Sequence, residues 1–352
     1  MSGTINKTEL ERRAINYDFA APVTSTASIA ETIVVGFGDG SVRFFQAGHE
    51  PRLIQAHEGV VLCMAVNQSY IFTGGDDGKF LRISLSGDVE EIANFGSRWV
   101  DCVAATSEAY ACSSDRATHV WSRKGSKASV LEHNSTVGGL SFDSKGKRLA
   151  VAHYGGVTVW EPNDRRWKSK KLIWKGFHSS VTFSPDDKYI ITIMQENALH
   201  GWRIRDKADL AMAGYPAKIK SFDWVGETPY LATSGADAAI CWPFDRKDGP
   251  LGRAPVCVAD GEKQLSTYVC SLSQENAVFA GFKNGEVLLA EIDESKDSIV
   301  LKNATNREIT AISLTKSLSH ILIGDEGGHV LWAALWAGAL NCLLYTSDAA
   351  DE

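Results

Sequence analysis

The chain has 352 residues, of which 44% are hydrophobic and 22% charged, and its formal net charge is −7. This is ordinary globular composition, which excludes disorder, collagen and coiled coil as the main state. No apolar run approaches the ~18–20 residues that a membrane-spanning helix needs. Length alone favours two domains, although a single all-β barrel or propeller can be this long.

The chain begins with a polar segment followed by a short alternating stretch. Residues 1–13 show no apolar core of a secretory signal and predict a flexible tail, which favours a cytoplasmic location. In residues 14–20, Ile15, Tyr17 and Phe19 alternate with polar residues, and such alternation predicts a β-strand.

The seven cysteines are scattered and contain no C-x-x-C pair. Most of them lie in apolar, strand-like stretches, which favours buried thiols in a reducing compartment. A disulfide framework or a metal site is the alternative.

The chain then repeats one pattern several times. Each unit has an apolar alternating stretch, a polar turn, a second apolar stretch, a tight turn rich in Gly, Asp or Asn, and a short strand that ends near an aromatic residue. Alternation bounded by turn residues is the strand signal. Clear examples occupy residues 137–162, 181–204 and 219–244.

The third strand of each unit ends at a position that can be followed along the chain. Eight such positions recur at steps of 38 to 48 residues. A period of about 40–45 residues with four short strands per unit is typical of WD-repeat propellers. The positions are Phe45, Ile83, Trp121, Trp160, Trp202, Trp242, Ala290 and Ala333.

In this pattern residues 14–334 resemble the WD-repeat family, in degenerate form. No unit ends its third strand with Trp-Asp, but four keep the family tryptophan, the turn aspartate survives in three units, and a histidine precedes the first strand in two. The resemblance implies that these residues lock the turns of a blade through hydrogen bonds and are not catalytic. They are Trp121, Trp160, Trp202 and Trp242, Asp39, Asp77 and Asp115, and His57 and His133, with His178 as a further candidate.

Eight units predict an eight-bladed all-β propeller, with seven blades, the commoner number in the family, as the alternative. A propeller ring has to join its ends, because an open blade exposes a strand edge. The eighth unit, residues 309–335, supplies only three strands. We therefore expect residues 14–20 to be the outer strand of the last blade and to close the ring.

The end of the chain, residues 335–352, is predicted to be a non-native or disordered tail. Its last eleven residues, CLLYTSDAADE from Cys342 to Glu352, resemble one reading frame of a transposase adapter used to prepare sequencing libraries. We exclude them from reasoning about the fold.

A search for catalytic chemistry finds none. There is no phosphate-binding loop, dinucleotide fingerprint, calcium loop, nucleophile elbow or zinc-protease helix. The nine histidines are scattered, so neither a metal site nor a cofactor is expected. The negative net charge disfavours nucleic acid, and the basic stretch Arg165–Lys171 is predicted to be a solvated rim, with a docking patch for an acidic partner as the alternative.

One stretch carries side chains suited to recognition. In the fourth and fifth units the turn between the second and third strands is polar, and by family geometry this turn lies on the loop face that usually binds partners. Aromatic and amide side chains are good binding anchors. The candidates are His153, Tyr154, Gln195, Glu196 and Asn197, with Tyr215 and Lys218 on the adjacent loop; the alternative is that they are ordinary turn residues.

Three classes of function follow. The first is a non-catalytic, monomeric protein-binding scaffold, similar to single-domain bacterial WD-repeat proteins with no assigned activity. The second is a propeller enzyme with a composite site at the central channel, of hydrolase, lyase or quinoprotein-like type. The third is an envelope-assembly propeller, which needs an export signal that residues 1–19 lack. The propeller pattern favours the first.

Overall fold

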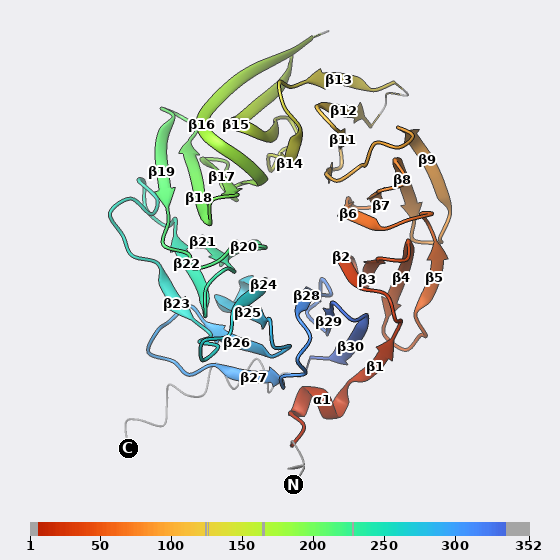
Figure 1. The fold of residues 1–352 in the computed structure, drawn as a ribbon, viewed down its shortest axis with the longest axis vertical. Helices are drawn as coiled ribbons and strands as arrows, with labels where there is room; N and C mark the ends of the chain where they lie inside the picture. The colour runs from red at the N-terminus through yellow and green to blue at the C-terminus, as the bar shows by residue number, and fades with distance from the viewer. Residues whose placement is uncertain (1–5, 124, 126, 164–165, 227–228, 336–352) are drawn as a thin grey trace. The chain divides into compact units, whose positions relative to one another are not determined.

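The computed structural model describes residues 6–123, 125, 127–163, 166–226 and 229–335. Its contacts divide the chain into two compact units, one of residues 24–218 and the other of residues 1–23 with 219–352. The fold is that of an all-β propeller, built from successive antiparallel sheets (Figure 1). Residues 336–352, which include the adapter-like end, lie outside the described residues.

The 24–218 unit holds four sheets, which follow one another in chain order. Three have four strands each and the fourth has six. Each strand pairs with the next along the chain through a short turn, as the alternating stretches and polar turns predicted. The first four-stranded sheet contains β2 (Val23–Ile29), β3 (Thr32–Phe37), β4 (Ser41–Gln46) and β5 (Arg52–Gln55). The second contains β6 (Val61–Val66), β7 (Tyr70–Gly75), β8 (Lys79–Ser84) and β9 (Val89–Asn94). The third contains β10 (Val103–Ala105), β11 (Ala109–Ser114), β12 (Ala117–Ser122) and β13 (Ser129–Glu132).

The six-stranded sheet contains the fourth and fifth sequence units together. Its strands are β14 (Val137–Phe142), β15 (Leu149–Asn163), β16 (Arg166–Phe183), β17 (Tyr189–Met194), β18 (Ala198–Arg203) and β19 (Ala208–Met212). The described strands therefore form seven sheets, the alternative count, and the expectation of eight separate sheets is corrected. The cause is the length of β15 and β16, because each runs on from pairing with one neighbour to pairing with the next.

The other unit holds three sheets. The first two are β20 (Phe222–Val225), β21 (Tyr230–Thr233), β22 (Ala239–Pro243) and β23 (Val256–Val258), and then β24 (Ser266–Leu272), β25 (Ala277–Phe282), β26 (Val287–Glu291) and β27 (Ile299–Lys302), with a 3-10 turn at Ser273–Glu275. The third contains β28 (Ile309–Leu314), β29 (His320–Asp325), β30 (His329–Ala334) and, beside β30, β1 (Ile15–Asp18).

The predicted N-terminal strand is thus present. Strand β1 pairs antiparallel with β30, from Ile15 opposite Trp332 to Asp18 opposite His329. It takes the free edge that three strands alone would expose.

A short helix precedes β1 and corrects the expectation of a flexible tail for residues 9–13; residues 1–5 of the predicted tail lie outside the described residues. Helix α1 (Glu9–Arg13) begins at a capping box, in which the Thr8 hydroxyl accepts from the Glu11 amide and the Glu11 carboxylate accepts from the Thr8 amide. The Thr8 hydroxyl also donates to Leu301 O of β27. We call Thr8–Asp18 the N-terminal clasp, because α1 contacts β27 while β1 pairs with β30.

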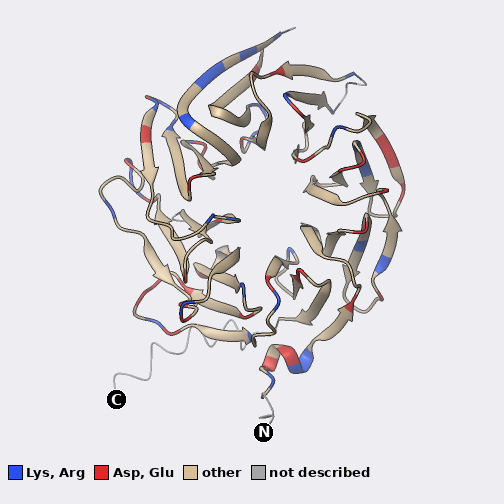
Figure 2. Ribbon diagram, in the orientation of Figure 1, with Lys and Arg blue, Asp and Glu red and all other residues tan. Residues whose placement is uncertain are grey.

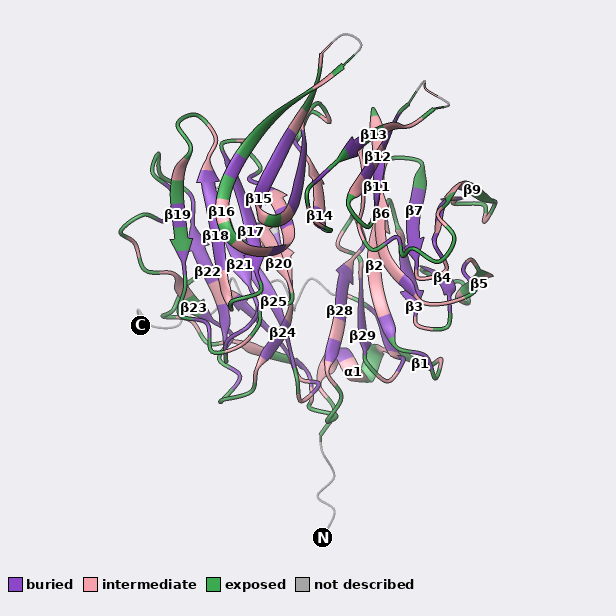
Figure 3. Ribbon diagram, turned by 45° about the horizontal axis from the view of Figure 1, so that its top comes forward, coloured by how far each residue is buried: buried purple, intermediate pink, exposed green. Residues whose placement is uncertain are grey.

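The cores lie between neighbouring sheets. Figure 3 shows middle strands such as β7 and β17 largely buried, the innermost strands β2 and β6 partly buried, and outer strands such as β9 and β19 more exposed. Every residue of β17 and β25 is buried. In the core between the last two sheets, Leu10 of α1 is fully buried with Leu272, Phe279 and Leu331. This apolar burial is the main stabilising term of the fold.

Candidate functional site

The polar turns predicted in the fourth and fifth units lie side by side. The backbone of Tyr154 pairs with Phe177 of β16. The amide of Gln195, in the turn between β17 and β18, donates to the carbonyl of the same Phe177 over 3.1 Å. One residue of β16 therefore joins two turns that are forty residues apart in the sequence.

Glu196 completes this surface. Gly176 has a φ of 101°, and a Cβ placed on it would lie 2.7 Å from Oε1 of Glu196, so the carboxylate lies directly over this glycine. A larger residue would meet the carboxylate and strain the backbone. We define the turn surface as Tyr154, Gly176, Phe177, Gln195 and Glu196.

The turn surface exposes the kinds of side chain that anchor protein partners. Tyr154 is 63% exposed, and Gln195 and Glu196 are exposed too. Ile173, which is 75% exposed, lies next to it, because it pairs with Gly156 two residues after Tyr154. An exposed tyrosine and isoleucine beside an amide and a carboxylate combine apolar area with directional hydrogen bonding.

The other predicted binding residues behave differently. His153 is engaged within its own turn, since its ring nitrogens contact Thr158 Oγ1 at 2.8 Å and Tyr154 O at 2.9 Å. Asn197 is half-buried and adopts a left-handed backbone (φ 54°), a turn role. Tyr215 is only 9% exposed, which corrects its prediction as a surface anchor, whereas Lys218 on the same loop is exposed.

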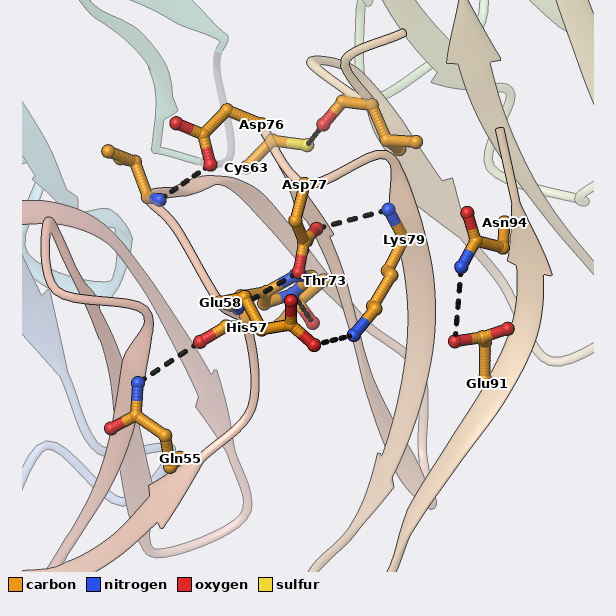
Figure 4. A network of polar contacts seen from close by, with 12 residues as sticks. Gln55, His57, Glu58, Cys63, Thr73, Asp76, Asp77, Lys79, Glu91 and Asn94 are labelled. Atoms are coloured by element: carbon orange, nitrogen blue, oxygen red, sulfur yellow. Dashed lines mark hydrogen bonds and ion pairs between the residues drawn. The ribbon is translucent and has the colours of Figure 1, made fainter. Parts of the chain in front are cut away.

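The repeat positions of the second unit form a buried polar network (Figure 4). His57 Nδ1 lies 3.0 Å from Asp77 Oδ1, and His57 Nε2 lies 2.9 Å from Thr73 Oγ1. Asp77 also accepts from the amides of Glu58 and Lys79. The family tryptophan position holds Ile83, which is fully buried, so here apolar packing takes the place of the indole.

Charge and burial oppose one another at Asp77. Burial raises the pKa of this carboxyl, but the hydrogen bonds from His57 and from two backbone amides more than offset it, and the net pKa is lowered. The carboxylate therefore stays ionised and ties the turn before β8 to the loop before β6. The network of His57, Thr73 and Asp77 therefore has a structural role.

Removing Asp77 tests this assignment. We expect Asp77→Ala to lower the free energy of unfolding by about 2 kcal/mol, because it leaves the buried His57 ring and two amides without their acceptor. Asp39→Ala is the matched control, since the exposed Asp39 carboxylate accepts from the Ser41 amide 3.0 Å away, and the bond from Gln55 Nε2 to the Asp39 backbone carbonyl survives the change. Thermal unfolding checks both variants, and equal small shifts would contradict the network.

The remaining repeat positions are also structural. Trp121 stacks on Tyr110 with ring centroids 5.7 Å apart, and Trp160 meets His133 edge-on at 5.9 Å. Exposed Asp115 accepts weakly from the Thr136 hydroxyl at 3.4 Å, and Trp202 and Trp242 are buried. His178 contacts Thr192 Oγ1 at 2.8 Å. These contacts hold turns and strands in place.

The described residues contain no grouping of three or more His, Cys, Asp or Glu side chains that could hold a metal ion. The six described cysteines are free thiols, and burial raises the pKa of Cys63, Cys102 and Cys112, which makes each a poor nucleophile. Among the described helices, none is both long and apolar enough to span a bilayer.

Among the exposed apolar side chains that the sequence reasoning missed, Trp99 and Ile173 are the most exposed. Trp99 is 60% exposed in the loop between β9 and β10, and Ile173 is exposed near the middle of β16. Trp99 follows Gly96, Ser97 and Arg98, so a large aromatic inside a polar loop was the available signal. Ile173 lies in a strand, and the pairing register, not the sequence, shows which face of that strand points outward.

Comparison with known proteins gives no match: neither the scan of protein-family models nor the search of curated proteins finds a relative of this chain. The repeat pattern and the sheets are therefore the grounds on which a function can be argued.

Proposed function

We propose that this protein is a non-catalytic interaction scaffold of the WD-repeat type, a cytoplasmic bacterial protein that binds a protein partner on one loop face. The observation that carries the proposal is the turn surface. There exposed Tyr154 of the fourth sequence repeat and exposed Gln195 and Glu196 of the fifth meet around Phe177. Rigid sheets below fix these side chains, so little entropy is lost when a partner binds.

We also propose that the six-stranded sheet represents two fused blades. Inside β15, Gly155 and Gly156 have φ values of 92° and 130°, and the side chains of His153 and Thr158 touch at 2.8 Å across them. Five residues of straight strand would hold these two side chains much farther apart. β15 thus folds back on itself and supplies the second and third strands of the fourth repeat, which gives eight repeats in all.

A double variant tests the binding site. We expect Tyr154→Ala combined with Gln195→Ala to leave the unfolding temperature nearly unchanged and to weaken partner binding at least about tenfold, the loss typical of a binding anchor. The partner is first captured from the native organism by affinity purification with mass spectrometry, and its affinity is then measured with purified proteins.

The chain offers a matched control in another turn. Gln68 lies in the loop before β7 and Tyr70 is the first residue of that strand; both are exposed and lie outside the turn surface. Gln68→Ala combined with Tyr70→Ala removes the same chemical groups and should bind as the unmodified protein does. Unchanged affinity of the Tyr154/Gln195 variant would refute the assigned site.

A further inference from the structure

The strand pair β15–β16 forms an arm. The two strands stay paired from Gly156 opposite Ile173 to Asn163 opposite Arg166, and Figures 1 and 3 show this hairpin extending beyond the neighbouring strands. Its base is anchored by buried Val157 and Leu172. Its outer strand is exposed at Arg166, Lys168, Ser169, Lys170, Lys171 and Ile173.

One edge of this arm is open. Residues 166–173 of β16 pair with β15 on one side, whereas β17 pairs only with residues 178–183. No strand within the described chain pairs with the other edge of residues 166–173. Two side-chain hydrogen bonds link residues 166–173 to the turn between β18 and β19: Lys207 Nζ donates to Lys171 O over 3.5 Å, and Lys170 Nζ donates to Ile204 O over 3.0 Å. An open edge presents backbone donors and acceptors to an added strand.

The open edge is strongly basic in a protein of net charge −7. Figure 2 shows the cations of β16 along this strand. Among the described residues, Arg166, Lys168, Lys170 and Lys171 form no ion pair within 4.0 Å, although Glu161 lies across the hairpin from Lys168. Unpaired cations in a row attract an anionic partner.

Lysines on an edge can also serve to prevent unwanted strand pairing. A purely protective edge would carry no large apolar group at its end. Here Ile173 is 75% exposed and lies close to Tyr154, which is 63% exposed. This apolar pair continues the basic edge directly into the turn surface and offers a partner a point of attachment.

We propose that the open edge of β16 binds an acidic segment in extended conformation, added as a further strand beside residues 166–173. Side chains alternate between the two faces of a strand, so Lys168 and Lys170 share one face while Lys171 and Ile173 share the other. The segment carries carboxylates opposite Lys168 and Lys170 on one face and an apolar residue opposite Ile173 on the other. This inference rests on the proposed function and names the chemistry of its partner.

A labelled peptide tests it directly. The probe is a fluorescein-tagged ten-residue peptide of alternating Glu and Val, titrated by fluorescence anisotropy at low and moderate salt. We expect Lys168→Glu, Lys170→Glu and Lys171→Glu together to weaken its binding at least about tenfold. The matched control, Lys145→Glu, Lys283→Glu and Lys316→Glu, makes the same charge change at exposed lysines elsewhere and should change the affinity less than about twofold.

Two further arms separate strand addition from simple charge attraction. A peptide of equal charge with Pro in place of Val cannot pair as a strand and should bind at least about tenfold more weakly; equal binding overturns the proposal. Ile173→Ser should weaken the Glu-Val probe about fivefold, whereas Val130→Ser, at a site 52% exposed on β13, should not. Displacement of the probe by single-stranded DNA or by phosphatidylserine vesicles as effectively as by unlabelled peptide also overturns it.

The captured partner distinguishes the two proposals. Loss of the partner in the triple-lysine variant as well as in the Tyr154/Gln195 variant supports both. If the triple-lysine variant keeps the partner and the Tyr154/Gln195 variant loses it, the inference about the edge fails and the proposed function stands. Retention by both variants overturns both.

Discussion

Replacing Leu10 with alanine is expected to lower the free energy of unfolding by about 3 kcal/mol. Leu10 is the one buried residue of α1, and its side chain is fully buried against Leu272, Phe279 and Leu331 of three strands. Truncating a buried leucine removes its transfer free energy and leaves a cavity, at a cost of about 2–5 kcal/mol. We expect a cost in the lower half of this range because the short helix α1 can move to fill part of the cavity.

The control for this change lies on the same helix. Glu9 is half-exposed and pairs with Arg12 and Arg13 of its own helix, so Glu9→Ala should lower the free energy of unfolding far less than Leu10→Ala does. Both variants are measured by urea unfolding at pH 7. Equal unfolding midpoints for Leu10→Ala and the unmodified protein would show that the N-terminal clasp contributes nothing.

Acid is expected to destabilise the protein between pH 6.5 and pH 4 through two buried histidines. Burial lowers the pKa of His133 and of His178 to about 4, from 6.5 in an unfolded chain. In this window the unfolded chain binds protons that the folded one does not, so stability is full above pH 6.5, falls as the pH falls towards 4, and then levels off. A pKa shift of this size corresponds to a loss of ~3 kcal/mol in the free energy of unfolding for each histidine. Because water partly reaches both rings, we expect a loss of about 2 kcal/mol for each.

Unfolding midpoints at pH 7.0, 5.5 and 4.5 measure this slope. His178→Gln removes one of these titrations and should make the dependence shallower; burial also lowers the pKa of His119 and of His200, so part of the slope remains. His49 is exposed, so His49→Gln should leave the slope unchanged. A midpoint independent of pH between 7 and 4.5 would contradict the assignment of these histidines as buried and neutral.

The strands were largely predictable because each one repeats a local pattern. Alternation in residues 15–19 predicted β1, and its partner β30 followed from the missing fourth strand of the last unit. Helix α1 was not predicted, because five polar-rich residues give no helical period and only Thr8 and Glu11 signal a start. Its stability comes from burial of Leu10, which is a tertiary effect.

The number of sheets could not be predicted from the repeat alone. The sequence shows where each unit ends, but not whether a strand stops between two units. β16 runs as one strand from Arg166 to Phe183. Between Leu172 and Phe177, Gly176 adopts a left-handed backbone without ending the strand. Glycine in a strand can mark an irregularity without ending the strand.

The candidate site was predicted in part. The turn residues were chosen by chemistry, and the contacts of Tyr154 and Gln195 with Phe177 show that two of the turns adjoin. Tyr215 was misjudged because loop position suggested exposure, while the packing of its ring decides burial. Trp99 and Ile173 were missed because exposure at a single position depends on which way a strand or loop faces.

The N-terminal clasp has a consequence for how the protein is made. The hydrogen bond from Thr8 to Leu301 spans 293 residues, and β1 pairs with the last described strand. The clasp therefore leaves the ribosome well before its partner strands β27 and β30, and it has no partner until they have been synthesised. Each sheet from β2 to β27 pairs locally and can form on the nascent chain, but β1 needs β30, so Ile15 and Tyr17 remain uncovered until β30 has been made.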